Sequence, residues 1–379
     1  MNTSVSLRGQ WIGSYSGTNT GDLVIDIDEL SDMFSGTAYA YDNTGLTDFV
    51  AQITINPKTN GGQFTLPLQP VNPVTRNPDK WDNVARMFPP NIVVPKTADV
   101  TLNLRSDDLL EVSFETDIQT NGRAALPRSQ ADRESELSSL PGMNNWSDFQ
   151  RFVSKLEPFT TIYRGQREQK RLRTAFHRTG RSDTARFLRV DIYRYLHRTL
   201  RTQHVFDLGK PDELGAFVNL AQHHGYPTPL LDWTYSPYVA AFFAYRRIKN
   251  SEAALFPGRK VRIFAFDYRR WSTLLQIARL EGATRPHLSI LQCVPIENDR
   301  VVAQQAVTTV TNIDDIESYI QHVQTLRFGG EKILVAIDLP WGLRREVMAQ
   351  LALMGITAGS LFPGIDGTCE ALRERLFDE

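Results

Sequence analysis

The spacing of apolar residues changes once along this 379-residue chain, between residues 127 and 145. Before that point, segments such as Leu23–Asp28 and Phe49–Ile55 alternate apolar and polar residues, which is typical of half-buried β-strands. After it, helical spacing alternates with short apolar runs, and the chain is too long for one ordinary core. We therefore predict an α+β protein with an all-β domain at 1–126, a polar linker at 127–145 and a mixed α+β domain at 146–379.

The first 126 residues carry several short strand patterns separated by turn residues. Further strands are expected at 100–105 and 110–115, joined by a hairpin turn at Ser106–Asp108. Residues 67–95 are rich in proline and asparagine and are expected to form a long irregular excursion. Short strands at this spacing predict a small barrel or sandwich, which we interpret as an accessory or sensor domain.

The second part of the chain is expected to alternate helices with strands. Pro211 and Pro340 mark two helix starts, because proline fits the first helical turn. Helices are predicted near 147–153, 168–178, 183–203, 211–222, 340–353 and 367–377. Strands are predicted at 161–165, 261–267, 300–303 and 332–338. This order of elements predicts the mixed α+β arrangement.

The composition excludes several classes of protein. With 41% hydrophobic residues, 22% charged residues and a net charge of −1, the chain is neither disordered nor a coat for nucleic acid. It contains no apolar run long enough to span a bilayer, and its start lacks the pattern of a signal peptide. Cys293 and Cys369 lie far apart and show no metal-ligand spacing. We therefore expect a reduced, cytoplasmic protein without a membrane partner or a bound metal.

The charges are spread unevenly. Residues 1–50 carry seven acids and one base, a balance of 1 − 7 = −6, whereas residues 164–201 carry twelve bases and three acids, a balance of 12 − 3 = +9. Such asymmetry indicates either two parts that contact each other or a basic surface for an anionic partner. The basic run is compatible with nucleic acid, with the phosphates of a dinucleotide, or with a solvated helix face partly neutralised by the acidic first domain.

The densest group of polar side chains lies between Ala221 and Pro237, around a glycine–proline turn. Its polar and aromatic members are His223, His224, Thr228, Asp232, Trp233, Thr234 and Ser236. Buried polar groups need hydrogen-bond partners, so a cluster of this kind usually marks a site. A histidine here could bind a ribose hydroxyl or transfer a proton.

Purely structural roles remain open for some of these residues. Either histidine can cap the end of the preceding helix, and Ser236 can cap the helix that begins at Pro237. Zinc is not favoured, because adjacent histidines project differently and no third ligand follows at helical spacing. A Gly-x-Ser-x-Gly elbow and a glycine-rich phosphate loop are both missing from the sequence.

A second candidate segment is Tyr163-Arg164-Gly165, where a predicted strand ends in an arginine followed by a glycine. Such an arginine can bind a phosphate through two parallel hydrogen bonds, and glycine permits unusual backbone geometry. An exposed arginine in an ordinary salt bridge is the alternative. The segment gains weight from the histidine-containing segment that follows.

Together these segments resemble the FRG domain, which is named for its (Phe/Tyr)-Arg-Gly signature. The resemblance covers about residues 145–379 and rests on four motifs in order. They are Tyr163-Arg164-Gly165-Gln166, the run from Leu220 to Ala244, the run Asn298 to Gln305, and the run Gly355 to Gly367. The order is similar to that of ADP-ribosyltransferases, which bind NAD in a cleft between two small antiparallel sheets.

The resemblance implies a role for each candidate residue. Arg164 would hold the phosphate or ribose of NAD, flanked by Tyr163 and Gly165. The nucleotide would be lined by His223, His224 and Thr228. The second motif would consist of Asp232, Thr234 and Ser236, with Trp233 beneath the nicotinamide or in the core.

The third motif departs from the transferase pattern. Where such an enzyme carries a glutamate, this chain has Gln304. An amide cannot act as a base or supply the negative charge that favours a positively charged transition state. Gln304 could still orient a ribose hydroxyl, so nucleotide binding is better supported than transfer.

The resemblance therefore implies an NAD-binding, ADP-ribosyltransferase-like effector that modifies a macromolecule or hydrolyses NAD, in a setting such as toxicity or defence against phage. A non-catalytic module that binds nucleotides, RNA or protein is the alternative. A third hypothesis is a hydrolase or nuclease that depends on His223 and His224. The acidic first domain would then sense a partner or restrain activity.

Overall fold

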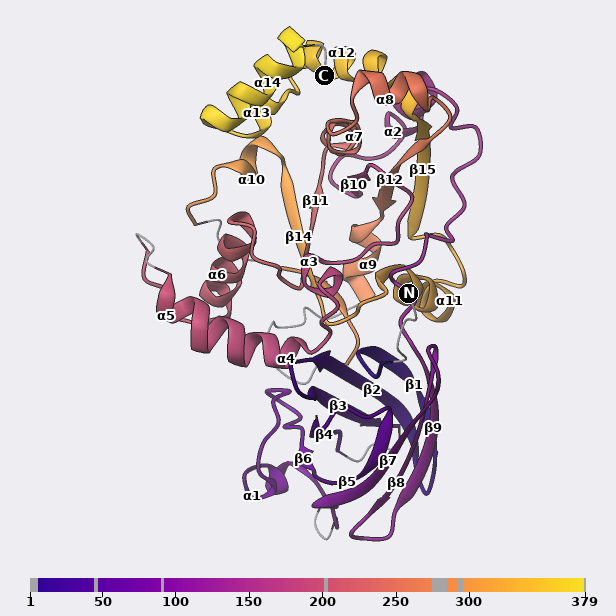
Figure 1. Ribbon diagram of the computed structural model, residues 1–379, viewed down its shortest axis with the longest axis vertical. Helices are drawn as coiled ribbons and strands as arrows, with labels where there is room; N and C mark the ends of the chain where they lie inside the picture. The colour runs from indigo at the N-terminus through magenta and orange to yellow at the C-terminus, as the bar shows by residue number, and fades with distance from the viewer. Residues whose placement is uncertain are drawn as a thin grey trace.

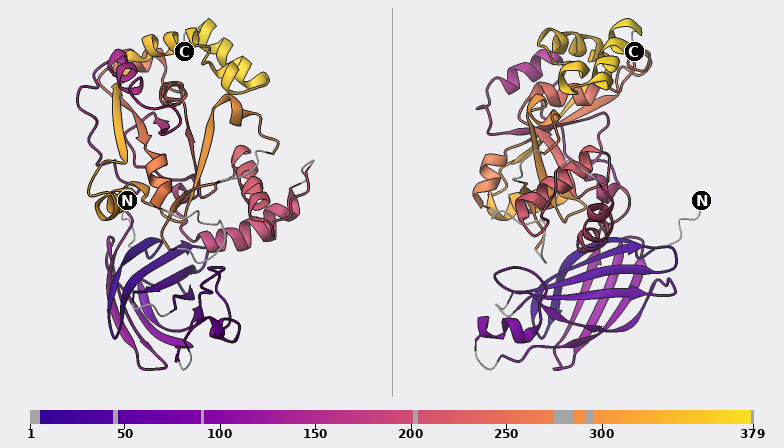
Figure 2. Two further views of the ribbon diagram at one scale, coloured as in Figure 1. Left: turned by 180° about the vertical axis from the view of Figure 1, so that it is seen from behind. Right: turned by 90° about the vertical axis from the view of Figure 1, so that its left-hand side faces the viewer.

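The computed structural model describes residues 6–43, 47–89, 92–200, 204–274, 285–291 and 296–377. An antiparallel β-structure lies at one end, and helices surround a second sheet at the other end (Figure 1). The same end-to-end arrangement is visible from behind and from the side (Figure 2). The predicted α+β class is confirmed. No helix in these ranges is both long enough and apolar enough to cross a membrane.

The N-terminal part is a nearly closed antiparallel barrel. Its elements are β1 (Gly9–Gly17), β2 (Thr20–Glu29), β3 (Phe34–Asp42), β4 (Phe49–Ile55), β5 (Gly61–Pro67), β6 (Gln69–Pro70), α1 (Trp81–Val84), η1 (Ala85–Met87), β7 (Thr97–Ser106), β8 (Leu109–Thr116) and β9 (Asn121–Pro127). The strand order is β5-β7-β8-β9-β1-β2-β3-β4-β6, and β4 also contacts β5 at the opposite edge. The predicted hairpin turn lies between β7 and β8, as expected.

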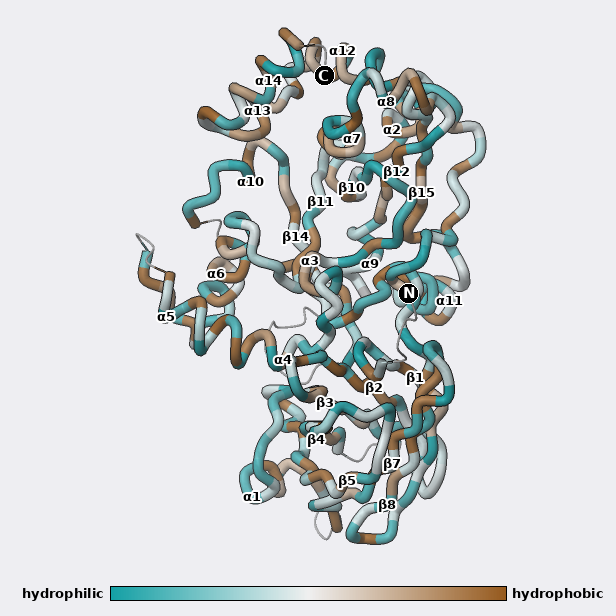
Figure 3. Tube along the Cα trace, viewed as in Figure 1, coloured by the Kyte–Doolittle hydropathy of each residue, from teal (hydrophilic) through white to brown (hydrophobic). Residues whose placement is uncertain are grey.

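Alternate side chains of the barrel strands point inward and form its core, and apolar and polar positions alternate along the trace (Figure 3). Trp11 is fully buried there, and its indole nitrogen donates to the Leu7 carbonyl at 2.9 Å. β2 departs from the expected pattern, because both of its faces are buried. Leu23–Asp28 is therefore a strand, as predicted, but it is not half-exposed, since the C-terminal part covers its outer face.

Two buried carboxylates join the barrel to the C-terminal part. Asp28 is fully buried and accepts hydrogen bonds from the backbone amides of Ser182 and Asp183, at 2.8 and 3.2 Å. Its other oxygen forms an ion pair with Arg181 at 3.0 Å. Asp183 in turn accepts a hydrogen bond from the Thr37 hydroxyl at 2.9 Å. The acidic barrel and the basic segment of the second part therefore contact each other directly, as the charge asymmetry suggested.

We expect Asp183→Asn to flatten part of the pH dependence of stability. Burial raises the pKa of Asp183 to about 6 from 3.8, so the folded protein holds this proton more tightly than the unfolded chain. The contribution is therefore full below about pH 4 and is lost as the pH rises towards 6. Two pKa units correspond to about 3 kcal/mol, an upper limit for the change.

The measurement is urea unfolding from pH 4 to pH 7.5. Asparagine keeps the side-chain oxygen that accepts from the Arg186 amide at 2.8 Å, and it is an equally good helix cap. The variant should therefore match or exceed the stability of the wild type at pH 7.5 and lose its advantage at pH 4. Parallel curves for the two proteins would contradict the prediction.

The C-terminal part contains a second antiparallel sheet and most of the helices. Its elements are α2 (Trp146–Val153), β10 (Ile162–Gln166), α3 (Ala175–Arg178), α4 (Thr184–Arg186), η2 (Phe187–Leu196), α5 (His197–Thr199), α6 (Pro211–His223), β11 (Leu230–Thr234), α7 (Pro237–Tyr245), α8 (Asn250–Leu255), β12 (Lys260–Phe266), α9 (Tyr268–Leu274), β13 (Leu288–Ile290), α10 (Arg300–Ala303), β14 (Ala306–Thr311), α11 (Ile316–Arg327), β15 (Leu334–Pro340), η3 (Trp341–Leu343), α12 (Arg344–Leu353), α13 (Ala358–Leu361) and α14 (Ile365–Phe377). Residues 184–199 are continuously helical, and η2 is a π-helical stretch within them.

The second sheet consists of two halves. Its strand order is β13-β14-β11-β10-β12-β15. The central strands β10 and β11 are paired at one position, Tyr163 opposite Thr234. In contrast, β10 pairs with β12 over Ile162–Gln166, and β11 pairs with β14 over Leu230–Thr234. The sheet therefore splits between β10 and β11 into two three-stranded groups. In Figure 1, β14 and β11 lie beside β10, β12 and β15.

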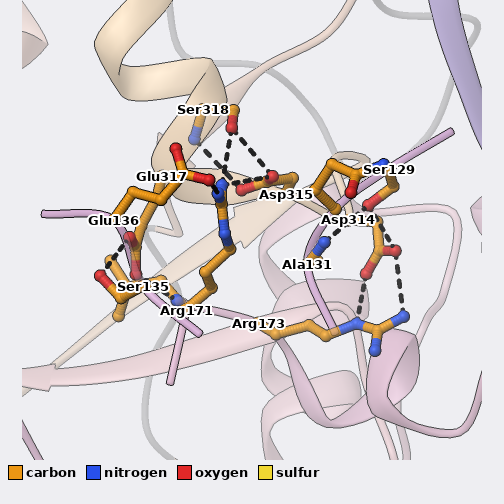
Figure 4. A network of polar contacts seen from close by, with 12 residues as sticks. Ser129, Ala131, Ser135, Glu136, Arg171, Arg173, Asp314, Asp315, Glu317 and Ser318 are labelled. Carbon is orange, nitrogen blue, oxygen red and sulfur yellow. Dashed lines mark hydrogen bonds and ion pairs between the residues drawn. The ribbon is translucent and has the colours of Figure 1, made fainter. Parts of the chain in front are cut away.

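The predicted helix at 168–178 is wrong over most of its length, because only Ala175–Arg178 is helical. The preceding residues are held in an extended path by ion pairs with the start of α11 (Figure 4). Arg171 pairs with Asp315 at 2.8 Å, and Arg173 pairs with Asp314 at 2.5 Å. Long-range charge pairing has overridden helical spacing at this segment.

The predicted strand at 300–303 is also wrong, because these residues form the short helix α10. The strand follows directly as β14, which contains five β-branched residues in six. The three apolar residues at 301–303 do not distinguish a strand from a helical turn, and the β-branched stretch that follows was the better signal.

Candidate functional site

A cleft lies where the second sheet splits. Its volume is about 530 Å³, within the range of small-molecule sites. Its lining comes from β10, α3, α6, β11, α7, α10, β14 and the residue after α13. Eight of the predicted site residues line it, namely Tyr163, Arg164, Gly165, His223, Asp232, Trp233, Thr234 and Gln304. The fold thus brings together residues from three motifs that are separated by up to 141 positions (304 − 163).

Gly165 allows the helix α7 to lie directly on β10. A Cβ atom at this position would overlap the carbonyl oxygen of Ala240 and lie 2.9 Å from the amide nitrogen of Ala244. Gly165 is not among the residues with positive φ, so its backbone conformation is ordinary. Glycine's tolerance of unusual backbone geometry is therefore not used at this position, and the close approach of a helix is the reason for glycine here.

Arg164 reaches from β10 across the cleft to the other half of the sheet. Its Nη1 donates to the backbone carbonyl of Asp232 at 2.5 Å. Its Nε is buried and has no hydrogen-bond partner in the structure. Burial lowers the pKa of Arg164 to about 10, so the guanidinium stays charged at neutral pH. A buried, charged donor without a partner is a candidate for binding an anionic ligand.

Asp232 supplies the one carboxylate among the described residues of the cleft. It opens onto the cleft, yet the surrounding walls remove much of its hydration and raise its pKa above the usual value. Gln222 donates to it at 2.5 Å and Thr308 at 3.5 Å. Arg164 opposes the upward shift of the pKa by its positive charge. The carboxylate is therefore positioned from two sides.

Thr234 and Gln304 connect β11 to the residues before β14. The Thr234 hydroxyl donates to the Gln304 carbonyl at 2.7 Å. The Gln304 side chain lines the cleft, and its amide nitrogen donates to the Leu361 carbonyl at 3.0 Å. Gln304 is therefore held from two directions at the cleft wall.

The two adjacent histidines occupy different environments. His223 is half-buried at the end of α6 and lines the cleft. Burial, and then the nearby Arg300, lower the pKa of His223, which favours the neutral imidazole. His224 is exposed, and its backbone caps α6, so its side chain does not line the cleft.

Three other predicted residues contribute to the structure around the cleft. Thr228 is fully buried and donates to the Gln222 side chain, which in turn holds Asp232. Ser236 caps α7 by accepting from the Val239 amide at 3.3 Å, the structural alternative noted above. Trp233 reaches the cleft wall, but its indole is buried and donates to the Thr309 hydroxyl at 3.0 Å.

Tyr226, in the loop between α6 and β11, connects the site to the barrel. Its hydroxyl donates to Asp191 at 2.9 Å. Asp191 also pairs with Arg181 at 2.5 Å, and Arg181 pairs with Asp28 of the barrel at 3.0 Å. Asp28, Arg181 and Asp191 thus connect the barrel to Tyr226, in the loop that follows His223.

The cleft is strongly basic. Six arginines line it, namely Arg164, Arg167, Arg178, Arg246, Arg247 and Arg300. Arg167 and Arg246 pair with Glu252 and Glu370, at 2.8 and 2.5 Å. No ion pair is formed by the other four arginines within the described ranges. The electrostatic potential of the site therefore favours an anion.

Sequence reasoning did not assign a role to several lining residues. They are Asn219, Gln222, Arg178, Arg246, Asn298, Arg300, Thr308 and Phe362. Three of these form a chain in which Asn298 donates to Asn219 at 3.2 Å and Asn219 donates to Thr308 at 3.4 Å. Gln222, Asn298, Arg300 and Phe362 lie inside the four FRG-like motifs, so motif membership was the available signal for them. Thr308 carried no such signal.

The described residues contain no cluster of three or more metal-ligating side chains. Cys369 is exposed and free, and Cys293 lies outside the described residues.

Residues 160–253 match the family model of the FRG domain. This region begins just before β10 and ends in α8, so it contains both the Tyr163-Arg164-Gly165 and the histidine-containing motifs. The resemblance expected for residues 145–159 and 254–379 stays a prediction. No curated protein and no solved structure matches the chain.

Proposed function

With the FRG domain at residues 160–253 as the premise, we propose that the cleft binds NAD and that the protein is an ADP-ribosyltransferase-like effector acting on a macromolecule or on water. The observation that carries the proposal is the cleft's charge, with six arginines against one carboxylate among its described residues. NAD carries its negative charge on two adjacent phosphates, and arginine is suited to phosphate oxygens. Arg164, with a buried Nε that lacks a partner, is the first candidate for that contact.

The split sheet supports the same proposal. A dinucleotide needs an elongated site with surfaces on two sides, and the cleft runs between the β10 half and the β11 half. Arg164 would bind the pyrophosphate from one half. Asp232 and Gln304 would face the nicotinamide ribose from the other half, with His223 near a ribose hydroxyl.

In the proposed reaction, the bond between the nicotinamide nitrogen and the ribose anomeric carbon breaks, and nicotinamide leaves with the electron pair. An oxygen of the acceptor forms the new bond, and its proton passes to Asp232. The ribose carbon becomes positively charged in the transition state, which a fixed carboxylate favours. Asp232 thus supplies the negative charge that the neutral Gln304 cannot supply.

The test is NAD consumption, with nicotinamide release and transfer of labelled ADP-ribose in cell lysate, for the wild type beside Asp232→Asn. Asparagine preserves the shape of the side chain and removes its charge, so we expect turnover to fall by roughly 100-fold or more while NAD affinity changes little. Asp107→Asn, in an exposed barrel turn, is the matched control and should behave as the wild type. Equal turnover in wild type and Asp232→Asn would remove Asp232 from the mechanism.

Gln304 favours a second candidate function, nucleotide binding without transfer. In that case calorimetry would detect saturable NAD binding to the wild type, and no nicotinamide would be released. Nucleic-acid binding is less favoured, because the arginine-rich segment is partly used within the protein, by Arg171, Arg173 and Arg181. A steep fall of affinity for nucleic acid with salt would restore that interpretation.

A further inference from the structure

The barrel contains a second cavity, separate from the cleft. Its volume is about 240 Å³. It lies inside the barrel, and its lining comes mainly from β2, β3, β4, β5, β7 and β8. The walls are mainly apolar, and they include Leu23, Ile25, Ile53, Leu66, Leu102 and Val112. Each of these six side chains is buried in the barrel core. A cavity with mainly apolar walls is favourable for an apolar ligand.

Small residues create the cavity. Ala38, Ala40, Ala51 and Ala98 all line it, and Ala38 faces Ala51 directly across β3 and β4. Inward positions of small barrels are normally filled by side chains. Four alanines on three strands therefore leave a gap that larger residues would close. Ala38 and Ala40 remain partly exposed although they point inward, so part of the cavity wall is accessible apolar surface.

The other end of the barrel interior is filled. Large inward residues occupy it and do not line the cavity, namely Leu7, Trp11, Ile27, Phe34, Ile55, Leu110 and Leu126. The barrel therefore has a packed end and a hollow end. Since the same barrel is filled at its other end, its curvature alone does not explain the hollow. The contrast indicates a site rather than loose packing.

The polar groups at the hollow end restrict the charge of the ligand. Tyr15, Asn19 and Asp42 line the cavity there, and Asn19 donates to Asp42 at 3.0 Å. Burial, and then the nearby acids Asp42 and Asp48, raise the pKa of Tyr15 to about 12, so its hydroxyl stays protonated at neutral pH. No lysine, arginine or histidine is among the described residues of the wall. An anionic ligand would therefore lack a counter-charge and face a carboxylate.

We propose that the hollow end of the barrel binds one small, uncharged, largely apolar molecule whose polar atom reaches Tyr15 and Asn19. An engineered cavity of roughly 150 Å³ with apolar walls binds benzene, so about 240 Å³ suits a molecule of roughly two fused rings or a short alkyl chain. The barrel would then be a receptor for such a compound. This proposal does not depend on NAD binding in the cleft.

The test uses the full chain and the neutral fluorescent probe 1-naphthylamine, which has two fused rings and one polar atom. We expect saturable binding at one site per chain, displaced by 1-decanol more effectively than by decanoate. Ala38→Leu adds three carbon atoms inside the cavity and should weaken binding by at least about tenfold, because the space for the probe is lost. Ala51→Leu places the same bulk on the facing strand and should act alike, which keeps the test valid when one variant does not fold.

Ala125→Leu is the matched control, because Ala125 lies on β9 with its side chain exposed. It should bind the probe as the wild type does, and circular dichroism should show that all three variants are folded. Wild-type affinity in both Ala38→Leu and Ala51→Leu, or no saturable binding by the wild type, would overturn the proposal. Stronger displacement by decanoate than by decanol would overturn the assigned charge class.

Discussion

Replacing Arg164 with alanine is expected to weaken NAD binding by roughly 10- to 150-fold, and to lower turnover at least as much. A hydrogen bond to a charged group contributes about 1.5–3 kcal/mol, and about 1.4 kcal/mol corresponds to tenfold. Arg164 also donates to the Asp232 carbonyl and favours ionisation of the Asp232 carboxyl group. Its loss would therefore remove a phosphate contact and raise the pKa of Asp232 further.

The measurement is NAD titration by calorimetry together with nicotinamide release. Arg164→Lys keeps the charge and loses the planar fork, so it should recover only part of the affinity. Arg269→Ala, an exposed arginine paired with Glu157 outside the cleft lining, is the control for general loss of positive charge. If Arg164→Ala binds NAD as tightly as Arg269→Ala does, the pyrophosphate does not lie at Arg164.

Gly165→Ala is expected to destabilise the protein by roughly 3 kcal/mol or more, at the upper end of what overpacking costs. The added methyl group would collide with backbone atoms of α7, and backbone cannot rotate away as a side chain can. Either α7 must move off β10, or β10 must shift together with Arg164. Both outcomes disturb the core between the sheet and the helix.

The measurement is the urea midpoint, followed by tryptophan fluorescence and circular dichroism. Gly258→Ala is the matched control, because nothing lies near a Cβ at that glycine and its φ is not positive. It should change the midpoint little. A midpoint for Gly165→Ala equal to that of Gly258→Ala would show that α7 adapts without cost.

Much of the fold was predictable because it depends on local pattern. Alternation of apolar residues predicted β4, β7 and β8, and helical spacing with a proline start predicted α6. The α+β class follows from these elements. α11, in contrast, was not predicted, although Asp315 caps it by accepting from the Ser318 amide at 3.1 Å. Its burial depends on partners distant in sequence.

The candidate site was predictable only where one segment carried several of its residues. Arg164, His223 and Asp232 were found from motifs, and the fold brings them to one cleft. The roles of Gly165 and Thr228 were not readable from the sequence, because they depend on Ala240 and Gln222. Spacing along the chain gives residue types and order, while contact between strands determines which side chain positions another.

The burial of β2 shows a further limit of local pattern. Asp26 and Asp28 occupy the polar positions of an alternating strand, which predicts that they face water. Both are buried. Asp28 is covered by the segment between α3 and α4, where it contacts Arg181, Ser182 and Asp183. Whether a strand face is buried depends on the rest of the chain, so the periodicity within β2 cannot predict it.

The single pairing of Tyr163 with Thr234 has a mechanical consequence. Within each half of the second sheet, the strands are paired over several residues, whereas the two halves are joined at one residue pair. A small twist of one half relative to the other would therefore leave the pairing within each half intact. Arg164 and Asp232 lie on opposite halves of the sheet, and the Arg164 side chain already donates one hydrogen bond to the Asp232 carbonyl. A ligand that contacts both halves would restrain their relative motion. We expect its binding to slow hydrogen exchange of the backbone amides at Tyr163 and Thr234.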